Sequence, residues 1–81
     1  MINKQEYILC SAIWYNDELY YGGQPINIES GYILCGFRHS NCIILHSLLT
    51  HKTTKSDDIQ GFLTSQNRFV DRAEAADIAY K

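Results

Sequence analysis

The chain has 81 residues, of which 46% are hydrophobic and 20% charged, and its formal net charge is −2. This length and composition predict one small globular domain spanning residues 1–81, with much apolar surface left uncovered when the chain folds alone. The negative charge argues against binding to DNA or RNA, because a nucleic-acid binder normally carries a basic stripe against the phosphates. An anionic ligand would therefore have to be held by a few concentrated cations.

The three cysteines are an odd number, and Cys10 and Cys35 lie inside apolar runs where a thiol packs as a small hydrophobe. We therefore expect reduced thiols and a cytoplasmic protein. We also expect no signal peptide and no membrane-spanning segment, because no apolar run approaches the ~20 residues that a spanning helix needs.

Residues 7–15 are apolar on both alternating faces, which predicts a central strand that is buried on both sides. A polar turn at 16–18 leads to a short segment, 19–21, that could return as a second strand, and Gly-Gly-Gln-Pro at 22–25 then breaks the pattern. After a loop, residues 32–37 predict another strand. Gly36 inside it indicates a bulge or a close approach to the backbone.

Ser40 or Asn41 is expected to cap a helix over residues 42–50, in which apolar residues recur at spacings of one turn. These apolar residues are Ile44, Leu45, Leu48 and Leu49. Residues 51–58 have no hydrophobic period and indicate a solvated loop. Residues 59–65 and 68–70 then predict a hairpin, because the asparagine between them, Asn67, tolerates the positive φ of a tight turn.

Asp71 is the expected N-cap of a final helix, and Glu74, three residues later, completes a capping box. This helix ends without a glycine or another C-terminal cap. A helix of roughly ten residues is marginal by itself. We therefore expect either a C-terminally truncated chain or a helix that packs against a second copy.

Two kinds of reactive centre are weakly indicated. His39, Cys42 and His46 are spaced so that an early helix start would place them on one face, as in an open zinc site. Cys42 beside either histidine could also form a nucleophilic pair. Neither pattern has a further ligand or an orienting third member, so we expect no metal, no other cofactor and no catalytic residue.

A pocket for an anionic, aromatic small molecule such as a nucleotide is better supported. Arginine matches phosphate oxygens bidentately, aromatic rings stack on a base, and amide side chains can read its edge. The residues of these types are Arg38, Arg68, Arg72, Phe37, Phe62, Phe69, Asn67 and Gln60. Two helix N-termini, which favour negative charge, would flank the same arginines. In the alternative interpretation, the phenylalanines are core residues and Arg68 and Arg72 are surface charges.

The chain resembles the first Thoeris anti-defence family of small phage-encoded proteins over nearly its whole length. The resemblance is carried by ILCSAIWY at 8–15, NIESG at 27–31, GFRH at 36–39, QGFLTS at 60–65, NRFVDR at 67–72 and EA at 74–75. It implies an α+β fold, a small and mainly antiparallel β-sheet with two helices, which oligomerises through the helices. Members of that family continue past the final helix.

Proteins of that family act as sponges that sequester, without cleaving, the cyclic ADP-ribose isomers made by bacterial Thoeris enzymes, and some form hexamers with separate sites for cyclic oligonucleotides. The resemblance therefore implies a non-enzymatic phage protein in the host bacterial cytoplasm, a homo-oligomer such as a dimer or a trimer of dimers. Its pocket would be shared between subunits.

Within such a pocket, Arg38 and Arg72 would hold phosphates, and Phe62 or Phe69 would stack on adenine. Asn67 with Thr64 would bond ribose or base edges, and His39 completes the expected ligand-binding set. One alternative is an interaction module that inhibits a bacterial host protein through Trp14, Tyr20 and Tyr21. The last alternative is an enzyme that processes ADP-ribose-type ligands.

Overall fold

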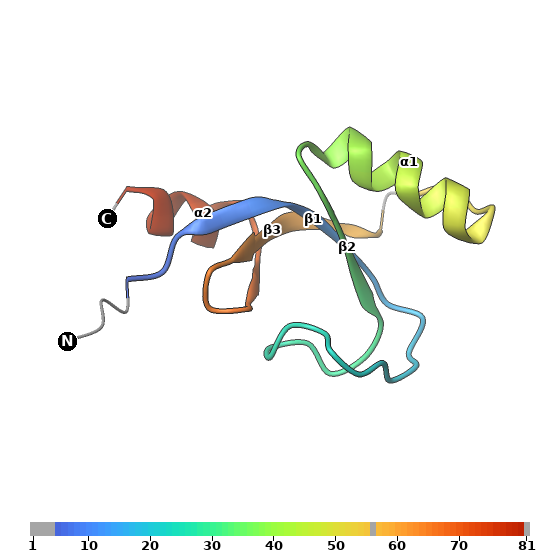
Figure 1. The fold of residues 1–81 in the computed structure, drawn as a ribbon, viewed down its shortest axis with the longest axis horizontal. Coiled ribbons are helices and arrows are strands. Elements are labelled where there is room, and N and C mark those ends of the chain that lie inside the picture. Colours follow the sequence, from blue (N-terminus) through green and yellow to red (C-terminus); the bar gives the residue numbers. More distant parts are fainter. Residues whose placement is uncertain (1–4, 56, 81) are drawn as a thin grey trace.

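The computed structural model describes residues 5–55 and 57–80. Their elements follow the order β1 (Ile8–Tyr15), β2 (Tyr32–Gly36), α1 (His39–Thr50), β3 (Ile59–Thr64), β4 (Phe69–Val70) and α2 (Arg72–Ala79) (Figure 1). The strands form one four-stranded sheet in the order β2-β1-β3-β4, with every neighbouring pair antiparallel. This confirms the predicted α+β class with an antiparallel sheet and two helices.

Both helices pack against the same face of the sheet. Directly paired residues of adjacent strands share a face, and so do alternate residues of one strand. Ser11 of β1 pairs with Phe62 of β3, and Phe62 pairs with Val70 of β4. The face that carries Ser11 therefore extends across three strands, and Figure 1 shows α1 and α2 toward opposite ends of the molecule.

Each helix closes its own small core on this face. Under α1, Cys42 packs with Ile13 and Tyr15 of β1, with Tyr32 and Leu34 of β2 beside them. Under α2, the buried residues are Val70, Ala75 and Ile78, with Ile8 and Phe62 beside them. The two cores lie along an elongated molecule of 45 × 24 × 18 Å.

Loop 16–31 covers part of the opposite face. Trp14 donates from Nε1 to the Ser30 carbonyl at 2.9 Å, and its ring lies edge-on to Phe69 at 6.1 Å. Asn27 holds both backbone groups of Phe69, at 2.7 and 2.9 Å. The expected strand at 19–21 was wrong: the Leu19 amide bonds the Asp17 side chain, so this segment forms a folded loop.

The central position of β1 is confirmed, but its burial on both sides holds only in the middle of the strand. Ala12 and Ile13, which face opposite sides, are completely buried. Tyr7 and Leu9 are more than half exposed, whereas Ile8 between them packs against the core under α2.

Helix α1 begins at His39, three residues before the predicted start. Arg38 occupies the N-cap position, and its amide donates to the Asn41 side chain at 2.9 Å, so Asn41 braces the first turn from inside the helix. A Cβ added to Gly36 would lie 2.8 Å from the Asn41 Cβ, which confirms the predicted close approach at this glycine. The tight turn thus delivers the start of α1 directly beside the end of β2.

The apolar face predicted for α1 points away from the sheet. The residues that α1 buries are Cys42 and His46, whereas Leu48 is 70% exposed and Leu49 is 63% exposed. Ile44 is also exposed. This exposed apolar row contains no charged residue, and none of the helices in the described part of the chain is long and apolar enough to cross a membrane.

The hairpin and the start of α2 match the prediction. Asn67 has a φ of 59°, in the left-handed region that its turn requires. Asp71 caps α2 by accepting from the Glu74 amide at 2.9 Å. The second half of the predicted capping box is replaced, because the Glu74 carboxylate lies 3.0 Å from Arg68 instead.

Candidate functional site

A groove of about 750 Å³ lies between the two helices on the helical face of the sheet. Its lining residues are Ile8, Ser11, Arg38, His39, Phe62, Arg72, Ala75, Ala76, Ala79 and Tyr80. They come from the first turns of both helices, the floor formed by β1 and β3, and one side of α2. This volume is within the usual range for small-molecule sites.

Two guanidinium groups flank the groove, one from the start of each helix. Arg38 lies over the ring of Phe37, with its Cζ 5.5 Å from the ring centroid. Arg72 places Nη2 3.4 Å from Oε1 of Gln60. Within residues 5–55 and 57–80, no carboxylate forms an ion pair with either arginine. Both charges are therefore available to an anionic ligand.

The two helix N-termini do not contribute equally. The first turn of α1 contains no acidic residue, so its positive end adds to the charge of Arg38. The first turn of α2 is already capped by the Asp71 carboxylate. On that side, attraction for an anion depends on Arg72 itself.

His39 and Phe62 form a rigid floor between the arginines. His39 Nε2 lies 2.7 Å from the Gly61 carbonyl, and its ring meets the ring of Phe62 edge-on at 5.2 Å. Phe62 in turn packs against the core under α2. The structure thus brings Arg38, His39, Phe62 and Arg72 together, which are four of the residues predicted from the sequence.

The other predicted ligand residues lie outside the groove and have partners within the fold. Thr64 is 1% exposed, and its hydroxyl donates to the Glu6 carboxylate. Asn67 forms the hairpin turn, where its carbonyl accepts from the Ile26 amide at 2.9 Å. Phe69 is 7% exposed and packs against Trp14 on the opposite face. None of the three borders the groove.

Arg68 is also removed from the groove by its ion pairs. It bonds Glu6 through two nitrogens, at 2.9 and 2.8 Å, and contacts Glu74 at 3.0 Å. The hydrogen bonds to Glu6, and to a smaller extent those to Glu74, raise the pKa of its guanidinium above the ordinary value for arginine. This arginine connects the N-terminal segment to α2.

The side chains considered for metal binding or nucleophilic catalysis point to separate partners. Cys42 Sγ contacts the carbonyls of Ser11 and Arg38 at 3.7 and 3.6 Å, and burial raises the pKa of this thiol. His46 stacks on Tyr15, with ring centroids 3.7 Å apart. Among the residues that the structure describes, no group of three His, Cys, Asp or Glu side chains is placed to hold a metal ion.

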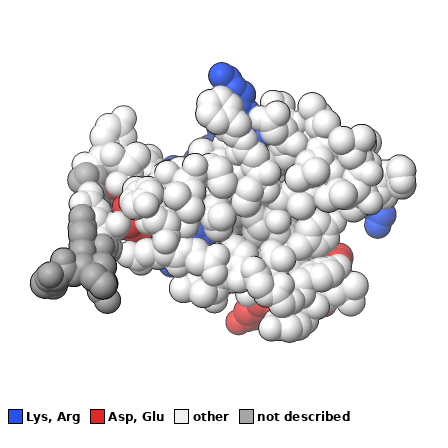
Figure 2. Space-filling model, in the orientation of Figure 1, with Lys and Arg blue, Asp and Glu red and all other residues white. Residues whose placement is uncertain are grey.

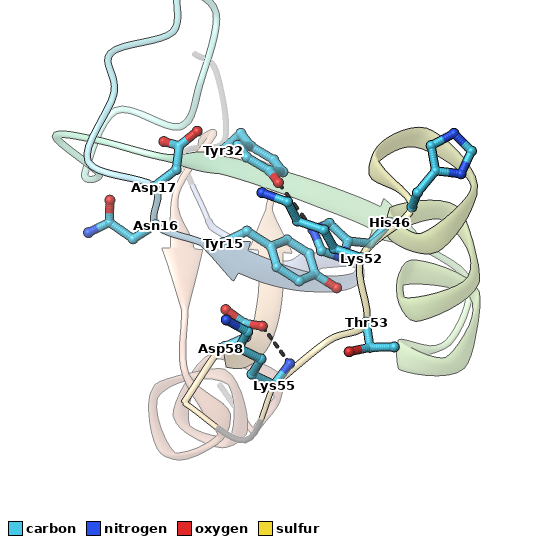
Figure 3. A pocket seen from close by; sticks show the side chains of 10 residues that line it. Tyr15, Asn16, Asp17, Tyr32, His46, Lys52, Thr53, Lys55 and Asp58 are labelled. Atoms are coloured by element: carbon cyan, nitrogen blue, oxygen red, sulfur yellow. Dashed lines mark hydrogen bonds between the residues drawn. The ribbon is translucent and has the colours of Figure 1, made fainter.

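A second hollow, of about 580 Å³, lies beyond the other end of β1 (Figure 3). Tyr32 and His46 bond across it at 3.1 Å, and the Tyr15 hydroxyl bonds Thr54 at 2.6 Å. Its charged lining residues are Lys52, Lys55, Asp17 and Asp58. Lysines and aspartates balance each other here, so this hollow offers an anion no concentrated positive charge.

Sequence reasoning missed the apolar wall of the groove. Ala75, Ala76 and Ala79 form a smooth small-residue face on α2, beside Tyr80. Ala79 follows Ala75 by four residues and Ala76 by three, which was a readable signal, because such positions are neighbours on a helix surface. Ser11, a serine within an otherwise apolar strand, was a second signal.

The basic side chains on one face of the molecule are dispersed. On the face shown in Figure 2, lysine and arginine side chains are scattered and do not form a continuous basic stripe. This face therefore differs from the extended basic surface of a general nucleic-acid binder.

Comparison with known proteins gives one family. No curated protein and no solved structure matches the chain. Residues 7–81 match the family model described as Phage T4 y16D protein, which is nearly the whole chain. The chain therefore belongs to the phage T4 y16D protein family.

Proposed function

We propose that this phage protein is a non-enzymatic sponge that binds and sequesters a cyclic ADP-ribose-type signalling nucleotide in the groove between α1 and α2. The observation that carries the proposal is the convergence of Arg38 and Arg72, neither of them paired with a carboxylate among the described residues, on one groove. The resemblance to the Thoeris anti-defence family supplies the ligand class. The host bacterial cytoplasm, where such a signal is made, is the proposed location.

The groove matches the parts of such a ligand. A pyrophosphate carries the negative charge that two guanidinium groups bind bidentately. We assign the adenine to the exposed part of the Phe62 ring, beside the alanine residues of α2 that also line the groove. This assignment places the base on Phe62, because Phe69 faces the other side of the sheet.

Sequestration requires tight binding without turnover. Against a micromolar signal, a sponge must bind in the nanomolar range, or about −12 kcal/mol. The described groove residues include no carboxylate and no thiol. The hydroxyl of Ser11, which also lines the groove, lies 3.5 Å from the Phe37 carbonyl. His39 is the titratable side chain on its floor, and one of its nitrogens is already bonded to Gly61.

The direct test is to mix the protein with cyclic ADP-ribose isomers, follow the depletion of free ligand, and then denature the protein by heat. A sponge depletes the ligand and releases it intact. An altered ligand would identify an enzyme instead. If no isomer is depleted, both interpretations are rejected.

We further propose that a second copy of the chain covers the exposed row of α1, as the resemblance implies. Leu48, Leu49 and Ile44 form an uncharged surface that can pack against its own copy about a twofold axis. Sedimentation of the wild type and of Leu48→Lys tests this assignment. The wild type should sediment as an oligomer and the variant as a smaller species; two identical monomer profiles would reject it.

A second candidate, inhibition of a host protein, is favoured by a different surface. Tyr20 is 84% exposed on loop 16–31, which also carries the exposed side chains of Leu19 and Ile26. Trp14 and Tyr21 are less available than expected, because Trp14 packs on Phe69 and Tyr21 on Tyr32. Tyr20→Ser should leave nucleotide capture unchanged and weaken only an interaction made through the loop.

A further inference from the structure

We propose that His39 is a specificity-determining residue of the groove, which accepts a hydrogen bond from a hydroxyl or amino group of the ligand through Nδ1. The inference rests on the proposed function and assigns the contact by which the groove would select its ligand. The groove would prefer a phosphorylated ribose compound, which presents hydroxyl groups near its phosphates, over a simple polyphosphate.

The tautomer of His39 follows from its partner. Nε2 lies 2.7 Å from the Gly61 carbonyl oxygen, and a carbonyl oxygen only accepts hydrogen bonds. Nε2 must therefore carry the proton and donate it. In the neutral ring the other nitrogen, Nδ1, then holds a lone pair and can only accept.

The orientation of the ring is held on two sides. The hydrogen bond to the Gly61 carbonyl holds the Nε2 edge of the imidazole, and the Phe62 ring, with its centroid 5.2 Å away, packs edge-on beside it. A Cβ added to Gly61 would lie 2.2 Å from the Val70 carbonyl, so a glycine is needed where β3 passes this close to its neighbour. The acceptor at Nδ1 is thus presented from a rigid support.

This acceptor is distinct from the rest of the polar lining. Arg38 and Arg72 have only donors, which suit phosphate oxygens and do not distinguish a nucleotide from inorganic pyrophosphate. Among the described residues, Nδ1 has no hydrogen-bond partner within the protein. A ligand with a hydroxyl or amino donor gives Nδ1 a hydrogen bond. A ligand with only phosphate oxygens places acceptors against the Nδ1 lone pair, and acceptors repel each other.

The test compares wild type, His39→Gln and His39→Asn by calorimetric titration with a cyclic ADP-ribose isomer and, separately, with inorganic pyrophosphate. The glutamine amide can replace the Nε2 donor to Gly61 but provides no acceptor at the Nδ1 position. We expect His39→Gln to lose roughly 10- to 100-fold in affinity for the cyclic nucleotide. Its affinity for pyrophosphate should stay within about threefold of wild type, since the arginines are intact.

The asparagine variant is the matched complement. Its shorter amide reaches the Nδ1 position and not Gly61, so it should recover part of the nucleotide affinity that glutamine loses. Loss of both ligands in His39→Gln to the same extent, in a protein with an unchanged melting curve, would show that His39 acts through charge or structure. Unchanged nucleotide binding in His39→Gln would overturn the role assigned to His39 and leave the proposed function intact.

A spectroscopic measurement on the wild type makes the test independent of any substitution. Nitrogen-15 shifts of the His39 ring should show a protonated Nε2 and an unprotonated Nδ1, both free and with the cyclic nucleotide bound. A protonated Nδ1 in the complex would mean that it donates to phosphate, which contradicts the proposal. A wild-type protein that binds no cyclic ADP-ribose isomer overturns the proposed function, and this assignment with it.

Discussion

The two hollows at either end of β1 have similar sizes and opposite chemistry. In the hollow beside Tyr15, the hydroxyls of Tyr15 and Tyr32 are bonded to Thr54 and His46, and lysines face aspartates. In the groove between the helices, Arg38 and Arg72 have no acidic partner among the described residues. The difference shows how a candidate binding site is distinguished from an ordinary polar hollow: charged side chains without an ion-pair partner are a better criterion than volume.

The same contrast separates two arginines only four residues apart. Arg68 is held by Glu6 and Glu74 and serves the fold. Among the described residues, the hydrogen bond of the Arg72 guanidinium is to the neutral amide of Gln60, at 3.4 Å. A carboxylate within reach, and not the position along the chain, decides which arginine can bind a ligand.

The largest expected effect comes from removing both groove cations. Arg38→Ala combined with Arg72→Ala should weaken capture of a cyclic ADP-ribose isomer by roughly 100- to 10,000-fold, because a hydrogen bond to a charged group contributes about 1.5–3 kcal/mol. The melting temperature should hardly change, since both side chains are exposed. Ligand depletion and thermal unfolding, measured on the same samples, check both halves of the prediction.

Lys52→Ala is the matched control in the second hollow. It removes one positive charge that faces Asp17, and it should leave capture unchanged. If Lys52→Ala abolishes capture while the double arginine variant binds normally, the assignment of the two hollows must be exchanged.

Local features of the fold were predictable because they depend on residues close together in the chain. The turn at Asn67 and the cap at Asp71 require only a tolerated φ and a bond that spans three residues. The start of α1 was placed three residues late, because the bond from the Arg38 amide to Asn41 begins the helix before the apolar pattern does.

The division of residues between the groove and the fold was not predictable, because it depends on distant pairings. Glu6 and Arg68 are separated by 62 positions. Phe62 and Phe69 look equivalent in the sequence, yet Phe69 pairs with Leu63, the neighbour of Phe62, so the two rings face opposite sides of the sheet. Which apolar stripe of α1 faces the sheet is likewise decided by packing.

The second-largest effect should separate the two arginines. Arg68→Met keeps the apolar stem and removes the bonds to Glu6, whose side chain is only 14% exposed. We expect a loss of about 1–3 kcal/mol in unfolding free energy, because a mostly buried carboxylate loses its arginine partner and keeps only its neutral ones, such as the Thr64 hydroxyl. The exposed pair with Glu74 should contribute little of this. Denaturant titration measures the loss.

Arg72→Met is the control for that experiment, with the same change four residues away. Its unfolding free energy should match the wild type within experimental error, and its capture should fall. The contrast between the two arginines would be contradicted if Arg68→Met kept full stability and lost capture instead.

A smaller effect is expected in the second hollow itself. Tyr15→Phe removes the hydroxyl that bonds Thr54 at 2.6 Å and keeps the ring stacked on His46. The variant should lose about 0.5–1.5 kcal/mol in stability, the usual contribution of one hydrogen bond. Capture should stay at the wild-type level; a change in ligand affinity would show that this hollow takes part in binding.

The smallest effect is a pH dependence confined to alkaline solution. Burial raises the pKa of Tyr15 and of Tyr32 above the ordinary value of 10.0. In alkaline solution the folded protein therefore keeps protons that the unfolded chain releases. The contribution of these two tyrosines to stability is fully present below pH 10.0 and is lost as the pH rises through the higher folded-state pKa values. Combining Tyr15→Phe with Tyr32→Phe should flatten this fall in denaturant titrations, whereas the exposed Tyr20→Phe should not. An equal slope in all variants would place the alkaline transition outside the second hollow.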